Sequence, residues 1–241
     1  MQTPTNSPVL AGGVLGDRRQ RPRVGSAADR AVLPVQAVSL QDLKNRPRKQ
    51  GEASFFYLDH HFQYNAVKVL PGEYFVSDEN IVMMTVLGSC ISACLWDTRA
   101  HIGGMNHFML PGGDGEEGFG RYGSYAMELL INEMLKCGAR RESMQAKIFG
   151  GAQVMANFTT MNVGERNTSF VIDYLQTERI PLLSQDVLDI YPRKVCFFPG
   201  TGKAMVKRLA SAHPEQLVVN EDRGNAATVA KSNAGGSVDL F

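Results

Sequence analysis

The stretch Met84–Leu110, MTVLGSCISACLWDTRAHIGGMNHFML, decides the fold of this chain. Two short apolar runs, Cys90–Trp96 and His101–Leu110, flank a polar break at Asp97–Ala100. Asp favours turns because its side chain bonds to nearby backbone N–H groups, and short apolar runs on both sides of such a break are typical of a β-hairpin. The sequence therefore predicts a hairpin at the centre of the fold.

The register of this hairpin places a thiol opposite an imidazole. If the turn is centred between Thr98 and Arg99, residues whose numbers sum to 197 face each other, and Cys90 faces His107. Directly opposed Cβ atoms lie about 4.5–5.5 Å apart, whereas a three-residue loop or a bulge would shift the pairing by one. A Cys activated by a His is the minimum set for thiolate catalysis. The alternative interpretation is a small buried core Cys and a structural His.

The residues before the thiol favour the catalytic interpretation. Gly88 allows a sharp turn and close approach of a substrate. The backbone N–H groups near Ser89 and Cys90 could then point at a developing oxyanion.

Length and composition limit the class of protein. The chain has 241 residues, of which 44% are hydrophobic, and its net charge is +1. This charge provides no overall field for nucleic acid or a membrane surface, and no apolar run is long enough for a membrane span. Four cysteines at irregular spacing do not indicate a disulfide framework or a zinc site, and no organic cofactor is indicated. Free thiols favour a reducing compartment, so a cytoplasmic protein is expected.

Composition divides the chain into three parts. Residues 1–50 hold many Arg and no aromatic residue, which predicts a disordered basic arm. Residues 53–209 are expected to form the folded domain. Residues 210–241 are small and polar and predict a flexible tail.

Helices and strands alternate through the folded part. Apolar spacing predicts helices over 124–137 and from about 164 to 175, and strands over 66–70, 73–77, 81–86, 146–149, 183–187, 195–198 and 204–209. The pair Gly150 and Gly151 directly follows a predicted strand and suits substrate approach. The loop at 111–120 is either a lid or a surface insertion. GTGK at 200–203 lacks the spacing of a phosphate loop and is predicted to be a hairpin turn.

Several motifs together resemble the bacterial CheD family of chemoreceptor glutamine deamidases. They are LGSC at 87–90, CLWD at 94–97, GMNHFMLP at 104–111, KIFGGA at 147–152, GERN at 164–167 and FPGTGK at 198–203. The resemblance covers residues 64–209, which is nearly all of the folded part.

The resemblance implies a fold, a reaction and a site. The fold is a single-domain α/β protein, a three-layer α/β/α sandwich with a mixed or antiparallel sheet. The reaction is hydrolysis of glutamine side chains on methyl-accepting chemotaxis receptors to glutamate and ammonia. Cys90 is the implied nucleophile and His107 the implied base. Thr85 is the candidate third member, although some relatives have this Thr one residue further from the Cys, where this chain has Met84.

The resemblance also implies partners. These are the cytoplasmic helical region of the receptors, in bacterial receptor arrays, and a CheC-type phosphatase. A regulatory binding module for that phosphatase or for the receptor, with little catalysis, is the alternative function. An intact Cys90 and His107 favour the enzyme. A cysteine protease would use similar chemistry but would need a substrate cleft.

Overall fold

The computed structural model describes residues 38–110, 116–153, 163–209 and 238–241. The helices are α1 Leu40–Asn45, α2 Glu116–Lys136 and α3 Val163–Thr177, with a short 3-10 helix at Arg141–Ser143. The strands are β1 Phe55–Asp59, β2 Tyr64–Lys68, β3 Tyr74–Ser77, β4 Ile81–Leu87, β5 Ile91–Asp97, β6 Ile102–Asn106, β7 Met144–Gly150, β8 Leu182–Val187, β9 Arg193–Phe198, β10 Lys203–Arg208 and β11 Val238–Leu240. Each strand and helix predicted from the apolar spacing is present. Most ends differ by one or two residues, but α2 begins at Glu116, eight residues before its predicted start, so residues 116–120, predicted as part of a loop, are helical instead.

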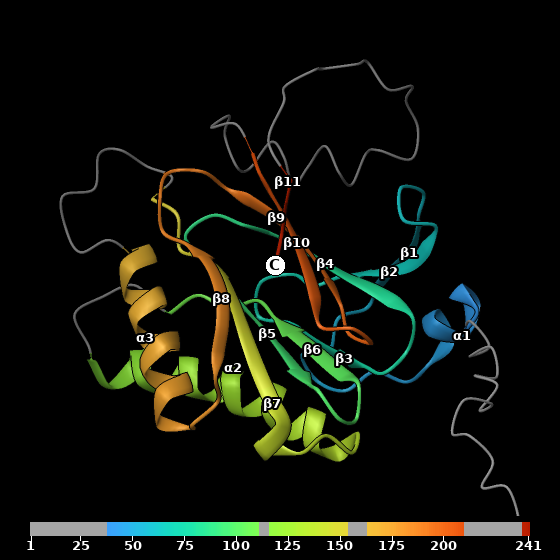
Figure 1. The fold of residues 1–241 in the computed structure, drawn as a ribbon, viewed down its shortest axis with the longest axis horizontal. Coiled ribbons are helices and arrows are strands. Elements are labelled where there is room, and N and C mark those ends of the chain that lie inside the picture. The colour runs from blue at the N-terminus through green and yellow to red at the C-terminus, as the bar shows by residue number, and fades with distance from the viewer. Residues whose placement is uncertain (1–37, 111–115, 154–162, 210–237) are drawn as a thin grey trace, which may run out of the picture. The chain divides into compact units, whose positions relative to one another are not determined.

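The strands form two mixed sheets (Figure 1). The five-stranded sheet has the order β3-β6-β5-β7-β8, and the six-stranded sheet has the order β1-β2-β4-β9-β10-β11. Within the described ranges, only the strand pairs β2–β4 and β7–β8 are parallel. The remaining pairs of the described strands are antiparallel, and short turns join β1 to β2, β5 to β6 and β9 to β10.

Two buried cores separate three layers. On one face of the five-stranded sheet, side chains such as Leu95 pack with Leu130 of α2 and Val171 of α3. On its other face, buried apolar side chains such as Met105 pack against the six-stranded sheet, for example against Phe197. The layers are therefore helices, sheet and sheet. An α/β sandwich with mixed sheets is confirmed, and in the described residues a second sheet occupies the layer where the family resemblance implied more helices.

The predicted hairpin is present as β5 and β6, but its predicted register is wrong. The observed pairs, such as Asp97 with Ile102, sum to 199 rather than 197. Asp97 explains the shift, because its Oδ1 accepts hydrogen bonds from the backbone N–H groups of Arg99 and Ala100 and so starts the turn at Asp97 itself. A shift of two residues keeps every side chain on its predicted face.

The folded part extends beyond residues 53–209. Helix α1 begins after Ser39, whose side chain caps it, and buries Leu43. Strand β11 pairs with β10, and the ring of Phe241 packs on Phe149 in the core between the sheets. The rest of the expected arm and tail, residues 1–37 and 210–237, and residues 111–115 of the expected lid loop lie outside the described residues. None of the described helices has both the length and the apolar composition of a membrane span.

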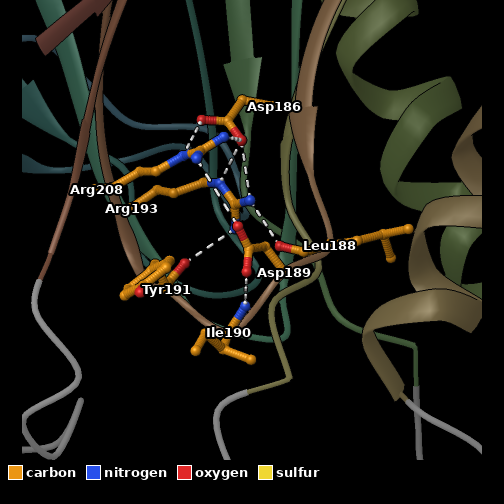
Figure 2. A network of polar contacts seen from close by, with 7 residues as sticks. All are labelled: Asp186, Leu188, Asp189, Ile190, Tyr191, Arg193 and Arg208. Carbon is orange, nitrogen blue, oxygen red and sulfur yellow. Dashed lines mark hydrogen bonds and ion pairs between the residues drawn. The ribbon is translucent and has the colours of Figure 1, made fainter. Parts of the chain in front are cut away.

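A buried ion-pair network fixes the turn after β8 (Figure 2). Arg193 is fully buried, and its Nε donates to Asp186 Oδ1 at 3.0 Å. The same guanidinium donates to the carbonyls of Leu188 and Tyr191 at 2.6 and 3.0 Å. Burial by itself would raise the pKa of Asp186, but hydrogen bonds from Arg208 and Arg193 outweigh burial and hold that pKa below its ordinary value. The carboxylate therefore stays charged between two guanidinium groups.

This network supports a strained turn behind the glycine pair. Leu188 and Asp189 have φ of 63° and 68°, a region that side chains other than Gly rarely adopt. The Leu188 N–H donates to the Gly150 carbonyl at 2.9 Å, and the Asp189 carbonyl accepts from Gln153 N–H at 2.8 Å. The turn thus holds the segment that follows β7.

Asp186→Asn is expected to destabilise the protein by about 3–5 kcal/mol, because it leaves the buried Arg193 charge without its partner. Urea unfolding followed by circular dichroism measures this loss. Asp189→Asn is the matched control: its side chain is 41% exposed and lies 3.8 Å from Arg208, so a change below about 0.5 kcal/mol is expected. Equal losses in the two variants would contradict a structural role for the buried pair.

Candidate active site

Cys90 lies in the turn between β4 and β5, one residue before β5 begins. Its thiol is free and half-buried, and it packs against the core between the two sheets. Its carbonyl accepts a hydrogen bond from the Gly151 N–H at 2.8 Å. The backbone of this residue is therefore anchored on the side of β7, and its side chain faces the six-stranded sheet.

His107 directly follows β6 and is 4% exposed. Its N–H donates to the Glu73 carbonyl at 2.9 Å, and its carbonyl accepts from the Gly72 N–H at 2.7 Å. These two bonds to the segment before β3 fix the backbone on both sides of the ring.

Thr85 is the group that touches this ring. It lies on the inner face of β4, and its Oγ1 is 2.8 Å from His107 Nδ1 and 2.8 Å from the Val69 carbonyl. Met84 points to the opposite face of the sheet, into the small outer cluster. Of the two positions that the sequence left open, only Thr85 is brought to His107.

The partners of Nδ1 assign the proton on the imidazole ring. The single hydroxyl proton of Thr85 is donated to the Val69 carbonyl, so the Thr85 oxygen acts as the acceptor toward His107. The same carbonyl lies 3.3 Å from Nδ1. Two acceptors around Nδ1 place the proton on that atom and leave the Nε2 lone pair free. Nε2 is buried and has no hydrogen-bond partner among the described residues.

Both members of the pair are neutral at rest. Burial lowers the pKa of His107 to about 4, and the hydrogen bond to the Val69 carbonyl offsets this only in part. Burial raises the pKa of the Cys90 thiol above its ordinary value of 9.0, against the opposite effect of its own backbone N–H. Desolvation disfavours charge in each case. At pH 7 the site therefore holds a thiol and a neutral imidazole, and a thiolate forms only as the proton leaves for a base.

Cys90 and His107 share one face of the five-stranded sheet. Their neighbours Ile91 and Phe108 form a hydrogen-bonded pair and point to the helix side, so Cys90 and His107 point to the other side. In the observed register they are diagonal, with Cα atoms about 7–8 Å apart. No hydrogen bond joins Sγ to the ring in the described structure. Such a contact often tightens only when substrate binds.

The other predicted site residues surround the Cys90 backbone. Gly150 has φ 110°, and a Cβ there would lie 2.1 Å from the Cys90 carbonyl oxygen, so only Gly allows this approach. The carbonyl of Gly88 accepts from Ala152 N–H at 2.8 Å. Because the Gly151 N–H is bonded to the Cys90 carbonyl, the glycine pair supports the turn that holds Cys90, and that N–H is not free to bind an oxyanion.

Two contributors to the site carried no clear signal in the sequence. The Val69 carbonyl is a backbone group, which any residue would supply. Asn167 of α3 is fully buried and bonds to the backbones of Ser89 and Leu110. Only the position of α3 brings this side chain to the backbone next to Cys90.

Comparison with known proteins agrees with the motifs. Residues 109–208 match the family described as CheD chemotactic sensory transduction. The chain is 76% identical to "probable chemoreceptor glutamine deamidase CheD 1" of Albidiferax ferrireducens, over 87% of this chain and 90% of that protein. It is 50% identical to "probable chemoreceptor glutamine deamidase CheD" of Thiobacillus denitrificans, over 78% of this chain and 96% of that protein. The corresponding protein of Methylobacillus flagellatus is 47% identical over 81% and 98%.

Proposed function

The chain belongs to the CheD family, and from this premise we propose that it is a chemoreceptor glutamine deamidase that uses Cys90 as nucleophile and His107 as base. The protein hydrolyses the side-chain amide of selected receptor glutamines to glutamate and ammonia. It needs no metal or organic cofactor for this reaction, because a thiolate attacks the amide directly.

The state of His107 is the observation that carries this proposal. Thr85 and the Val69 carbonyl hold Nδ1–H, and Nε2 is left as an unpartnered lone pair on the sheet face shared with Cys90. A His buried only for packing would ordinarily find partners for both nitrogens. A ring fixed at one nitrogen and open at the other is what a general base requires.

The first half of the reaction forms a thioester. His107 Nε2 takes the Cys90 proton as Sγ attacks the carboxamide carbon, and the carbonyl oxygen becomes an oxyanion. The carbon–nitrogen bond then breaks, and the proton on Nε2 passes to the leaving nitrogen, which departs as ammonia. Neutral His107 can perform both transfers because it begins and ends this half uncharged.

The second half consumes water. His107 Nε2 takes a proton from a water molecule as its oxygen attacks the thioester carbon. The carbon–sulfur bond breaks, and the proton returns to Sγ. The products are a glutamate side chain and the original thiol, so each cycle uses one water and releases one ammonia.

The substrate and partners follow from the same premise. The protein acts on the cytoplasmic helical region of methyl-accepting receptors and therefore works in the cytoplasm at receptor arrays. A CheC-type phosphatase is a second partner. A purely regulatory binding role would not require the free Nε2.

Mass spectrometry of a purified receptor cytoplasmic fragment tests the function. Incubation with the full-length protein is expected to add about 1 Da at individual glutamines, the change from amide to acid, with one ammonia released for each. A receptor fragment with those glutamines already replaced by glutamate is the control. A fragment that binds the protein but gains no mass would reject the deamidase in favour of the binding module.

A further inference from the structure

The strands that carry the nucleophile and the base separate just before Cys90. Ile91 and Phe108 exchange two backbone hydrogen bonds of 2.9 Å. In an antiparallel ladder of this register the next hydrogen-bonded pair is Ser89 with Leu110, because the numbers again sum to 199. In such a pair the Leu110 N–H would donate to the Ser89 carbonyl.

The carboxamide of Asn167 occupies the place of that bond. The Leu110 N–H donates to Asn167 Oδ1 at 3.0 Å, and Asn167 Nδ2 donates to the Ser89 carbonyl at 2.7 Å. Asn167 is fully buried. The orientation of its amide is fixed by its partners, because an N–H must meet the oxygen and a carbonyl must meet the nitrogen. A side chain of α3 thus bridges the two backbones like an inserted peptide group.

We infer that Asn167 is a positioning residue for deamidation, which holds the Ser89–Cys90 peptide so that the Cys90 N–H is presented on the thiol side as the oxyanion donor. This inference rests on the proposed function. It adds a residue from α3 to a site otherwise built from β4, the turn before β5 and the end of β6.

The rigidity of the peptide group connects Asn167 to Cys90. The Ser89 carbonyl and the Cys90 N–H belong to one planar trans unit and point in opposite directions. Because Asn167 draws the carbonyl toward α3, the N–H points away from α3. That N–H lies beside the Cys90 sulfur and has no other partner among the described residues. A carbonyl under attack by Sγ develops its negative charge within reach of such a donor.

The second bond of the carboxamide sets the spacing of the two segments. Leu110 lies three residues after His107, and its N–H is held by the same side chain that holds Ser89. The ladder is extended by one amide group instead of closing directly. Cys90, which lies between Ser89 and Ile91, is therefore kept at the point where the strands are held apart.

Asn167→Asp tests this arrangement in the full-length protein. The carboxylate still accepts from the Leu110 N–H but cannot donate to the Ser89 carbonyl. We expect kcat for ammonia release to fall about 10²-fold at pH 7.5, near the effect of losing one oxyanion donor, with KM changed less than about threefold. Lowering the pH should recover part of the loss relative to wild type, because a protonated carboxyl donates again.

Alkylation of Cys90 gives a readout that needs no substrate. The rate of modification by iodoacetamide is measured against pH on the Cys90 peptide by mass spectrometry. If the peptide group turns in Asn167→Asp, its N–H leaves the sulfur and the thiol loses a hydrogen bond that favours its charged form. The midpoint of the alkylation profile should then move to higher pH than in wild type.

Leu175→Ala is the matched control for stability. Leu175 is a core residue of the same helix, eight residues after Asn167. It should lower the unfolding midpoint and leave both kcat and the alkylation profile unchanged. An Asn167→Asp kcat within threefold of wild type overturns the inference. A fall in kcat in Leu175→Ala as large as that in Asn167→Asp also overturns it, because lost stability alone would then explain the effect. If wild type releases no ammonia, the proposed function fails, and the alkylation profile alone decides whether Asn167 sets the Cys90 peptide.

Discussion

Cys90→Ser is expected to lower kcat for ammonia release by at least about 10⁴-fold, the range seen when an enzyme loses its nucleophile. The serine hydroxyl fits the same half-buried position but is far less acidic than the thiol. His107, whose pKa burial lowers to about 4, would have to take its proton from this less acidic hydroxyl, so attack on the unreactive amide becomes much slower than with the thiol. The measurement is ammonia release from receptor fragments, with the modified glutamines counted by mass spectrometry.

The fold should survive this change. Cys90 lies at the margin of the core between the sheets, and the exchange of sulfur for oxygen leaves the turn intact, so the urea midpoint should change little. Cys137→Ser is the matched control, because this thiol is exposed at the end of α2 and should leave the activity unchanged. If Cys90→Ser kept a tenth of wild-type activity, another group would have to be the nucleophile.

His107→Ala is expected to lower kcat/KM by about 10²–10⁴-fold at pH 7, the usual contribution of a general base. Without this ring the thiol must lose its proton to solvent. Burial raises the pKa of Cys90 above 9.0, so the activity of the variant should rise with pH up to and beyond pH 9, by about tenfold per unit. Wild type should show no such rise between pH 6 and 8.

The acid limb of the wild-type profile follows from the lowered pKa of His107. A base is lost as it becomes protonated, so kcat/KM should stay flat from pH 7 down to about pH 5 and fall below the pKa of about 4.

The free energy of unfolding should change with pH in the same direction. Between the ordinary pKa of 6.5 and about 4, the unfolded chain binds a proton that folded His107 does not, so the free energy of unfolding decreases as pH falls. Circular dichroism at each pH separates the two effects.

Two further variants serve as comparisons for His107→Ala, one next to the ring and one remote from it. Thr85→Val removes the hydroxyl beside Nδ1 but leaves the Val69 carbonyl as an acceptor, so a loss of about tenfold is expected, the equivalent of one net hydrogen bond. His61→Ala, in the turn between β1 and β2, should have no effect. An acid limb near 6.5 in wild type would contradict the buried neutral ring.

The family motifs and the short-range patterns predicted much of this protein. Local spacing predicted strands β2 to β10, including the β5–β6 hairpin, and both long helices, because alternation and helical periodicity act over a few residues. It did not predict α1, β1 or β11. The identities of Cys90 and His107 and their common face were also accessible from sequence, because a register shift of two preserves the face. The motifs then indicated the family before any contact was known.

Long-range contacts decided the rest. The turn starts at Asp97, whose carboxylate also accepts from the Arg140 N–H, 43 residues away, and this moved the register from the predicted value. The layer that covers the inner face of the hairpin is a second sheet. Apolar alternation within one strand shows that a face is buried, but it does not show whether a sheet or helices cover that face. The choice of Thr85 over Met84 depended on which face of β4 meets that layer.

The sequence by itself therefore determined most of the strands, both long helices, the family that the motifs indicate and the common face of Cys90 and His107, since these depend on neighbouring residues. Tertiary structure alone decided the tautomer of His107, through Thr85 and the Val69 carbonyl, and the insertion of Asn167 between Ser89 and Leu110. Those contacts join segments distant in the chain, and several involve backbone groups that every residue carries, so no local pattern encodes them.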